Sequence, residues 1–306
     1  MTPTEVRGTK DGVRGKIVAG VALAVLGGAV VTLQAVRERQ FPDTEPAAEV
    51  LYVSSPAVMT RLALGFDDLL SDLYWIRAIQ YYGRARLLRS SEARYDLLYP
   101  LLDLTTSLDP RFRVAYNFGS FFLAEPAPGG AGRPDLAIRL LEKGMAANPH
   151  RWEYPHDIGF VYYRQGEYVR AAEWFRRAAQ VPGATNWLEP LAATTLATGG
   201  DVRSSRLLWQ NVMATSEHQW LRDQGRKALL QLDAVDQKRQ LEQLTAEYER
   251  RHGDPPPTWE HLMRDGALRA LPRDPAGYVF SLNPWWGTVD VAEDSPLRPL
   301  PVDNPR

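Results

Sequence analysis

Three features of this 306-residue chain could in principle bind a metal or a phosphate or take part in acid/base catalysis. They are its histidines, its acidic pairs and one glycine-rich loop. The histidines are His150, His156, His218, His252 and His261. They form no i, i+4 pair and no HExxH motif, so a helical zinc site has no support. The loop at 129–132 lacks the Lys-Ser/Thr that holds a nucleotide phosphate, and Asp67-Asp68 suits a helix start better than acid/base catalysis. We therefore expect no enzyme activity, no metal and no cofactor.

The overall composition excludes further classes of protein. The chain contains no cysteine, which excludes disulfide frameworks, zinc-thiolate sites and cysteine nucleophiles. Its 37 acidic and 36 basic residues give a net charge of -1, so we expect no nucleic-acid partner. With 44% hydrophobic residues, the chain has enough apolar surface to fold into a packed structure.

An uncharged apolar segment of twenty residues, 17–36, stands apart near the N-terminus. At about 1.5 Å per residue, a helix of this length spans a hydrocarbon core of roughly 30 Å. A cleaved signal peptide is the alternative, but the segment is too long and no A-x-A-like site precedes Arg37. Lys and Arg residues in 1–16 outnumber those just after the segment, which favours a cytoplasmic N-terminal tail. We predict a single-pass protein of the bacterial inner membrane with a periplasmic C-terminal domain.

Small residues lie on one face of this predicted transmembrane helix, at Gly20, Ala24 and Gly28. This small-xxx-small spacing lets two membrane helices approach closely and predicts a homodimer contact. The alternative is that Gly and Ala are simply frequent in membrane helices. Residues 37–65 are predicted to form a linker, because the stretch 41–55 is Pro-rich and irregular.

Small residues recur at a fixed period in the middle of the chain, since Ala137, Ala171 and Ser205 are 34 residues apart. One unit also carries, in order, Ile158-Gly159, Tyr162, Ala171, Phe175 and Pro182. This pattern resembles the tetratricopeptide repeat (TPR) family, in which small residues let paired helices cross closely and Pro ends the second helix. The resemblance implies an all-α superhelix of about three and a half repeats over 66–215, enough to bury a continuous core.

The neighbouring units match this pattern less closely. The leading unit begins with a helix predicted at 66–86, which carries Trp75. The next unit opens with Phe118-Gly119, and a Gly- and Pro-rich insertion at 125–134 lengthens its turn by six residues. We interpret this insertion either as an ordered irregularity or as a flexible flap.

The chain after the repeats predicts a long helix followed by a small tail. Residues 216–252 have an apolar helical face and are predicted to cap the superhelix. In the tail, 253–306, Trp285 and Trp286 are predicted to form a small core. The expected tail elements are a short helix from Thr258 to Gly266 and hairpin strands at 278–282 and 288–291.

A set of spaced residues in the tail has a recognisable order: Tyr248, Gly253, Pro256, Leu262, Gly266, Leu271-Pro272, Asp274-Pro275 and Gly277-Tyr278. This order resembles the C-terminal half of bacterial secretion pseudopilins. The chain departs from that family because its N-terminus lacks the cleavable leader and the Phe-then-Glu start, so polymerisation into a pilus is not expected. The alternative is a compact cap with no relation to secretion.

A repeat superhelix binds partners mainly on the concave face made by the first helix of each pair. By repeat register, Trp75 and Tyr82 are expected there. The predicted peptide-binding residues are Arg113, Tyr116, Ser120, Glu153, His156, Tyr163 and Arg164. Aromatic anchors mixed with hydrogen-bond donors are typical of peptide grooves, and the alternative is that the aromatic residues pack between repeats. The Lys and Asn clamp by which some TPR proteins hold chaperone tails has no equivalent at these positions.

The sequence predicts a membrane-anchored TPR scaffold or adaptor that binds proteins or peptides in the cell envelope. The pseudopilin resemblance favours a place beside a secretion or type IV pilus machine. Two alternatives stay open: a structural protein associated with the cell wall or outer membrane, and a cytosol-facing receptor if the topology is inverted. A local basic stretch is either a solvated helix face or a contact for anionic lipid headgroups; its members are Arg77, Arg84, Arg86, Arg89 and Arg94.

Overall fold

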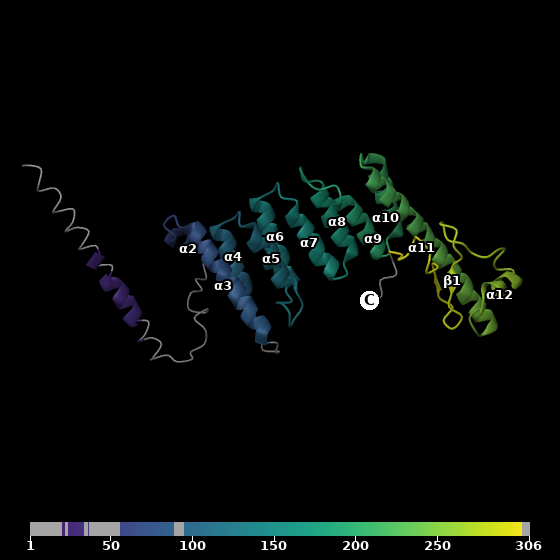
Figure 1. The fold of residues 1–306 in the computed structure, drawn as a ribbon, viewed down its shortest axis with the longest axis horizontal. Helices are drawn as coiled ribbons and strands as arrows, with labels where there is room; N and C mark the ends of the chain where they lie inside the picture. The colour runs from purple at the N-terminus through teal and green to yellow at the C-terminus, as the bar shows by residue number, and fades with distance from the viewer. Residues whose placement is uncertain (1–19, 22–23, 34–35, 37–55, 89–94, 302–306) are drawn as a thin grey trace, which may run out of the picture. The chain divides into compact units, whose positions relative to one another are not determined.

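The computed structural model describes residues 20–21, 24–33, 36, 56–88 and 95–301. Backbone contacts divide the chain into two compact units, Met1–Tyr52 and Val53–Arg306. The described part is mostly helical, with two short strands near the C-terminal end (Figure 1). This confirms the expected all-α class.

The first unit contains the predicted transmembrane segment. Its described residues are helical, and Gly20 and Gly28 have no heavy atom within 4 Å of the place a Cβ would take. Residues 17–19, 22–23 and 34–35 of the segment lie outside the described residues, as do 1–16 and 37–55. Among the helices that the structure describes, none is both long and apolar enough to cross a bilayer. The membrane span therefore stays a prediction.

The second unit is built from helix pairs that lie side by side in chain order (Figure 1). The pairs are α3 (Asp67–Leu88) with α4 (Leu98–Leu108), α5 (Arg113–Ala124) with α6 (Pro134–Ala147), α7 (Glu153–Arg164) with α8 (Tyr168–Ala179), and α9 (Leu188–Thr198) with α10 (Val202–Thr215). A short helix, α2 (Pro56–Leu62), packs against α4 and buries Met59. The predicted linker over 37–65 therefore includes a packed helix.

Small residues occupy the tightest places inside these pairs. Ala137, Ala171 and Ser205, the residues spaced by 34, are fully buried on α6, α8 and α10. Gly159 of α7 faces α8 so closely that a Cβ would lie 2.6 Å from the Phe175 ring and 3.0 Å from the carbonyl oxygen of Ala171. The helices can cross at this distance only because the side chain is a hydrogen atom.

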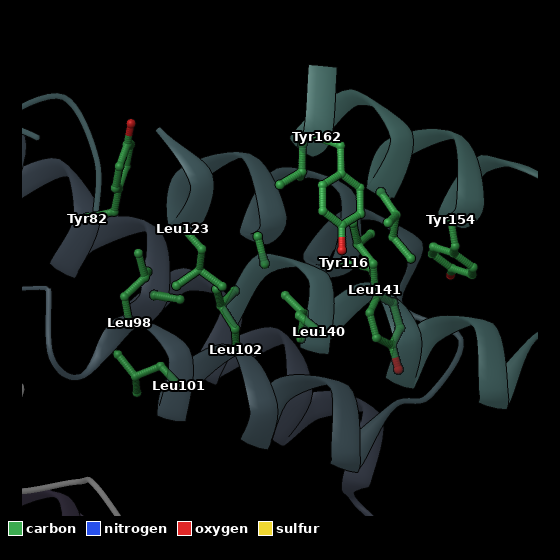
Figure 2. Close-up of a cluster of buried hydrophobic side chains, with 14 of the residues drawn as sticks. Tyr82, Leu98, Leu101, Leu102, Tyr116, Leu123, Leu140, Leu141, Tyr154 and Tyr162 are labelled. Atoms are coloured by element: carbon green, nitrogen blue, oxygen red, sulfur yellow. The ribbon is translucent and has the colours of Figure 1, made fainter. Parts of the chain in front are cut away.

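One continuous core runs through the pairs from α2 to α9. Figure 2 shows its part between α3 and α7. Leu102 and Leu140 meet beside Gly119, where a Cβ would lie 2.8 Å and 3.1 Å from their methyl groups. Tyr116 and Tyr154 lie edge to face, with ring centroids 5.3 Å apart. The core is therefore shared between successive pairs, as expected of a repeat array whose single units cannot bury their own apolar faces.

The insertion in the second pair is an ordered loop between α5 and α6. Its backbone folds back on α5 through the hydrogen bonds from Gly132 N to Glu125 O, at 2.8 Å, and from Arg133 N to Leu123 O, at 2.7 Å. The Tyr82 hydroxyl of α3 donates to the carbonyl of Gly129 at 2.9 Å. Of the two interpretations of this insertion, the structure therefore favours the ordered irregularity.

The long helix α11 (Gln219–His252) follows the array and carries the tail. It ends at Gly253, whose φ of 91° suits the left-handed C-cap and whose N–H donates to Glu249 O at 2.7 Å. The tail consists of α12 (Trp259–Arg264) and an antiparallel hairpin of β1 (Ser281–Leu282) and β2 (Val289–Asp290). Both tail elements were predicted, with longer strands than are observed.

The core of the tail differs from the prediction. Trp285 and Trp286 are 83% and 78% exposed at the hairpin tip, so the prediction that they form the core is wrong. Trp259 takes that place: it is buried, and its indole Nε1 donates to Phe280 O at 2.8 Å. The reason is the turn: Asn283 Oδ1 accepts from the backbone N–H groups of both exposed tryptophans, and Thr245 of α11 donates to the carbonyl of Gly287 at 2.7 Å, so the turn is tied to α11 by its backbone while the two indoles stay exposed.

The close crossing of α7 and α8 can be tested by substitution. Gly159→Ala should lower the free energy of unfolding by about 1–3 kcal/mol, because the added methyl group overlaps the buried Phe175 ring. Urea unfolding followed by circular dichroism measures the change. Gly83→Ala is the matched control: Gly83 lies within α3, where a Cβ meets nothing within 4 Å, so stability should stay equal or rise by up to about 1 kcal/mol. Equal effects of both substitutions would contradict the close crossing.

Candidate functional site

A largely apolar groove lies between α5 and α7, the first helices of two successive pairs, and has a volume of about 480 Å³. We call it the phenylalanine groove. It is lined by Asn117, Phe118, Ser120, Phe121, Phe122, Ala124, Asp157, Phe160, Val161 and Arg164. Three of its phenylalanines are half exposed: Phe118 at 56%, Phe121 at 45% and Phe160 at 48%. Large apolar side chains held at the surface in a concave site are typical of peptide-binding grooves.

The phenylalanines reach the groove because α5 is apolar on two sides. Tyr116 and Leu123 point into the core, and both are fully buried. With 3.6 residues per turn, Phe118 and Phe121 fall on the opposite side of the same helix. Burial of the first side fixes the helix, so the second side is presented to solvent as a rigid surface. Such preorganisation lowers the entropic cost of binding.

One ion pair joins α7 to the residue that follows α5. Arg164 Nη2 of α7 lies 2.5 Å from Glu125 Oε2, just after α5, and the Arg164 guanidinium also sits 5.4 Å from the centroid of the Phe121 ring. Both charged side chains are about 30% exposed. The pair links the two walls, and its partial desolvation against an aromatic ring strengthens it relative to a fully exposed pair.

One polar atom in the groove wall has no partner. Asn117 Oδ1 is buried and accepts no hydrogen bond from any residue that the structure describes. A buried carbonyl oxygen without a donor costs free energy, but this atom is closed to solvent, so a bound chain reaches it only if the Asn117 side chain rotates. The wall is therefore mainly an apolar surface, with Asn117 among its lining residues.

Two of the predicted binding residues, Ser120 and Arg164, lie in the phenylalanine groove. Ser120 is almost fully buried, and its hydroxyl donates to the carbonyl oxygen of Asn117 at 2.8 Å. It therefore forms part of the groove floor and holds the backbone of Asn117. Of these two predicted residues, only Arg164 carries a charge, and Asp157 is a second charged residue in the lining.

Arg113 and Glu153 form a separate cluster at the starts of α5 and α7. Glu153 Oε1 lies 3.6 Å from Arg113 Nη1 and 3.5 Å from Arg151 Nη1. The Glu153 side chain is only 19% exposed, whereas both arginine side chains are largely open to solvent. The cluster is an ion-pair network that joins neighbouring pairs, and it lies outside the lining of the phenylalanine groove.

Tyr116 does not line any open surface. It is fully buried between α5 and its neighbours, and its hydroxyl donates to Thr106 O at 3.4 Å. Burial raises the pKa of Tyr116 to about 12. The expectation that Tyr116 anchors a peptide is therefore corrected: its ring fills the core beside Gly144, whose missing side chain leaves the space.

His156 and Tyr163 are occupied by aromatic contacts along α7. The His156 ring lies 5.6 Å from Phe175 and 5.5 Å from Trp187, and its Nδ1 is 2.9 Å from Asp157 Oδ1. Tyr163 stacks on Phe160 with ring centroids 6.2 Å apart. These two residues support the groove wall without lining it.

Trp75 and Tyr82, also expected on the concave face, pack on the neighbouring pair. The ring of Tyr82 stacks on Phe122 with centroids 4.0 Å apart, and the ring of Trp75 stacks on Phe122 at 6.3 Å. Tyr82 is buried and Trp75 is half-buried. For these aromatic residues, packing between successive pairs is the correct interpretation.

Sequence reasoning missed Phe118, Phe121, Phe160 and Asn117 as groove residues. The sequence of α5 contained an indication of exposed aromatic residues. It has three phenylalanines within 118–122, and they cannot all lie on the same buried helix face as Tyr116. No comparable signal marks Asn117 or Phe160, since each becomes part of a site only through the crossing of α5 and α7. In the described ranges, no group of three or more His, Asp or Glu side chains is arranged to hold a metal ion.

Comparison of the chain with models of protein families finds no matching family, and comparison with curated proteins finds no similar protein. The structural class of this protein is therefore defined by its fold and its groove alone. It is a helical-hairpin array with an aromatic surface groove and a small helix-and-hairpin tail.

The burial of Tyr116 predicts how stability depends on alkaline pH. The folded protein holds the phenol proton to about pH 12, whereas an unfolded chain loses it near the ordinary value of 10.0. The stabilisation is complete below that value and is lost as pH rises towards the folded pKa. Tyr116→Phe removes this proton, so its free energy of unfolding should fall less steeply from about pH 9 to about pH 11 than that of the wild type. Urea unfolding at both pH values measures the slopes, and parallel slopes would contradict the burial of the phenol.

Proposed function

We propose that this protein is a membrane-anchored TPR scaffold that captures an apolar peptide segment of another envelope protein in the phenylalanine groove. The observation that carries the proposal is the groove itself, with its three half-exposed phenylalanines. Exposing three large aromatic side chains to water on one concave surface is unfavourable, whereas burying them against a bound chain is favourable.

The repeat architecture supports the TPR assignment within this proposal. The three small residues spaced by 34 all take the same buried place on the second helices of successive pairs. Helix α8 ends at Ala179, before Pro182, as the family pattern requires. The membrane anchor at 17–36, its periplasmic C-terminal domain and the homodimer through Gly20, Ala24 and Gly28 rest on the sequence patterns given above.

The chemistry of the groove defines the kind of partner. Its lining is mostly apolar, so affinity comes from large aliphatic or aromatic side chains that bury against Phe118 and Phe160. Arg164 is already paired with Glu125, so a carboxylate of the partner would have to displace Glu125. The groove therefore selects apolar segments and gives little preference to acidic chain ends.

A second candidate site is the tip of the tail. Trp285 and Trp286 are highly exposed on a turn held by Asn283, which is a rigid presentation of two large aromatic side chains. This observation favours the tail as the docking element beside a secretion or pilus machine. The two candidates are separable because the tip lies outside the lining of the phenylalanine groove.

The groove is tested by peptide selection against the full-length protein in detergent. A library of random peptides should be enriched in sequences with spaced large apolar side chains. Binding of a selected peptide, measured by fluorescence anisotropy, should weaken by about tenfold or more in Phe118→Ala and in Phe160→Ala, because aromatic anchors carry most of the affinity of such sites.

Trp285→Ala is the matched control for these variants, since it removes an exposed aromatic side chain from the tail tip. It should leave the affinity unchanged, and circular dichroism should show that all three variants are folded. Loss of binding in Trp285→Ala with full binding in both groove variants would assign docking to the tail and contradict the groove.

The proposed topology is tested with a reporter fused after Arg306. Because Lys and Arg favour a cytoplasmic N-terminus, a reporter that is active only in the periplasm should be active in this fusion. Inverting the charge bias, by replacing Arg7, Lys10, Arg14 and Lys16 with Gln, should reduce that activity. Activity of a cytoplasm-only reporter in the unaltered fusion would reverse the assignment and favour the receptor alternative.

A further inference from the structure

A second concave site lies where the last helix pair meets the beginning of α11, a part of the fold in which α9, α10 and α11 are neighbours (Figure 1). Its volume is about 280 Å³, and all three helices contribute to its wall. We call it the tryptophan pocket, because Trp187, Trp209 and Trp220 line it. Trp187 and Trp220 are 38% and 52% exposed, whereas Trp209 is buried in the wall.

The lining of the tryptophan pocket offers hydrogen-bond donors but no charge. Among the lining residues that the structure describes, none is acidic or basic, and the polar side chains other than the indoles are Gln224, Gln231 and Thr194. None of the three indole Nε1–H groups donates to an acceptor in the described part of the chain. An indole nitrogen can donate a hydrogen bond but cannot accept one. The pocket therefore suits a largely apolar ligand that presents hydrogen-bond acceptors.

The chain itself shows what this side of α11 can bind. Residues 296–301 read Pro-Leu-Arg-Pro-Leu-Pro. The side chain of Gln231, which lines the pocket, holds this segment by its backbone: Nε2 donates to Leu297 O at 2.9 Å and to Pro299 O at 3.0 Å. Two residues further on, Pro301 lies in the lining of the tryptophan pocket. The pocket therefore continues a surface that already binds a proline-rich strand through its carbonyl oxygens.

A proline-rich chain matches the unpaired groups of the pocket. Proline has no N–H group, but its carbonyl oxygen accepts hydrogen bonds and its ring packs on the face of an indole. An extended proline-rich segment also loses little conformational entropy on binding. We propose that the tryptophan pocket binds a proline-rich segment of another protein. This pocket shares no lining residue with the phenylalanine groove, so the proposal does not depend on the function proposed for that groove.

Two other kinds of ligand fit the tryptophan pocket less well. A sugar ring stacks on tryptophan, but its hydroxyl groups donate as well as accept, and the described lining has no carboxylate to receive them. A quaternary ammonium ion is attracted to aromatic faces, but it presents no acceptor to the indole N–H groups. The unpaired donors favour a ligand whose polar groups only accept, which is the character of a proline-rich chain.

The proposal is tested with fluorescein-labelled decaproline and the full-length protein in detergent, by fluorescence anisotropy. Decaproline should bind at least about tenfold more tightly than a labelled peptide of the same length made of Gly and Ser. Trp220→Ala should weaken the binding of decaproline by about tenfold or more, because it removes a half-exposed ring from the pocket. Trp220→Phe should weaken it by about fivefold, since phenylalanine keeps a ring but lacks the N–H group.

Phe66→Ala is the matched control, because it removes an exposed aromatic side chain from outside the pocket lining. It should leave the affinity for decaproline unchanged, and circular dichroism should show that all variants are folded. Equal affinities for decaproline and for the Gly-Ser peptide, or equal affinities of Trp220→Ala and the wild type, would overturn the proposal. Loss of binding in Phe118→Ala with full binding in Trp220→Ala would place decaproline in the phenylalanine groove, which also overturns it.

The other possible occupants give different results. Oligomers of N-acetylglucosamine and tetramethylammonium are titrated in place of decaproline, with intrinsic tryptophan fluorescence as the measurement. A saturable change with either of them that Trp220→Ala abolishes, together with no binding of decaproline, would assign the pocket to that ligand and overturn the proposal. Binding of decaproline only after deletion of residues 302–306 would assign the pocket to the continuation of this chain beyond Pro301, and the proposal would fail.

Discussion

The close crossing of two helices at a residue without a side chain is the constraint on which the rest of the second unit depends. At Gly159 the backbone of α7 comes within van der Waals distance of Phe175 and Ala171. A single pair of helices has no interior of its own, so it buries its apolar surface only against the next pair. The hydrophobic core therefore continues from each pair to its neighbour. The spacing of the pairs sets the distance between α5 and α7, and with it the width of the phenylalanine groove.

A packed array of this kind also leaves apolar surface outside the core. Helices α3 and α5 each have one apolar side inside and one outside, whereas α8 is apolar on one side and carries arginines on the other. Exposed apolar surface of this kind promotes contacts with other molecules. On α5 it lines the groove that we propose as a peptide site.

The period of small residues was enough to predict the helix pairs, because Ala137, Ala171 and Ser205 mark places where only small side chains fit. Side-chain direction was harder to predict. Tyr116 and Phe118 lie on one helix two positions apart, yet the first is in the core and the second is at the surface. Both are aromatic, so residue type alone does not separate them. The same holds in the tail, where Trp259 is buried and Trp285 is exposed because Asn283 shapes the turn. Residues brought together by the crossing of α5 and α7, such as Asn117 and Phe160, have no common signal in the sequence.

The groove and the proposed homodimer have a joint consequence for affinity. A groove of about 480 Å³ holds only a few side chains, so one groove binds a short segment weakly. The homodimer proposed through Gly20, Ala24 and Gly28 would present two grooves in one assembly. A partner with two apolar segments, or two partners held on one membrane, would bind through both, because the second contact forms at the high local concentration set by the first. Weak individual contacts with strong joint binding are what a scaffold needs if it has to release its partners as well as collect them.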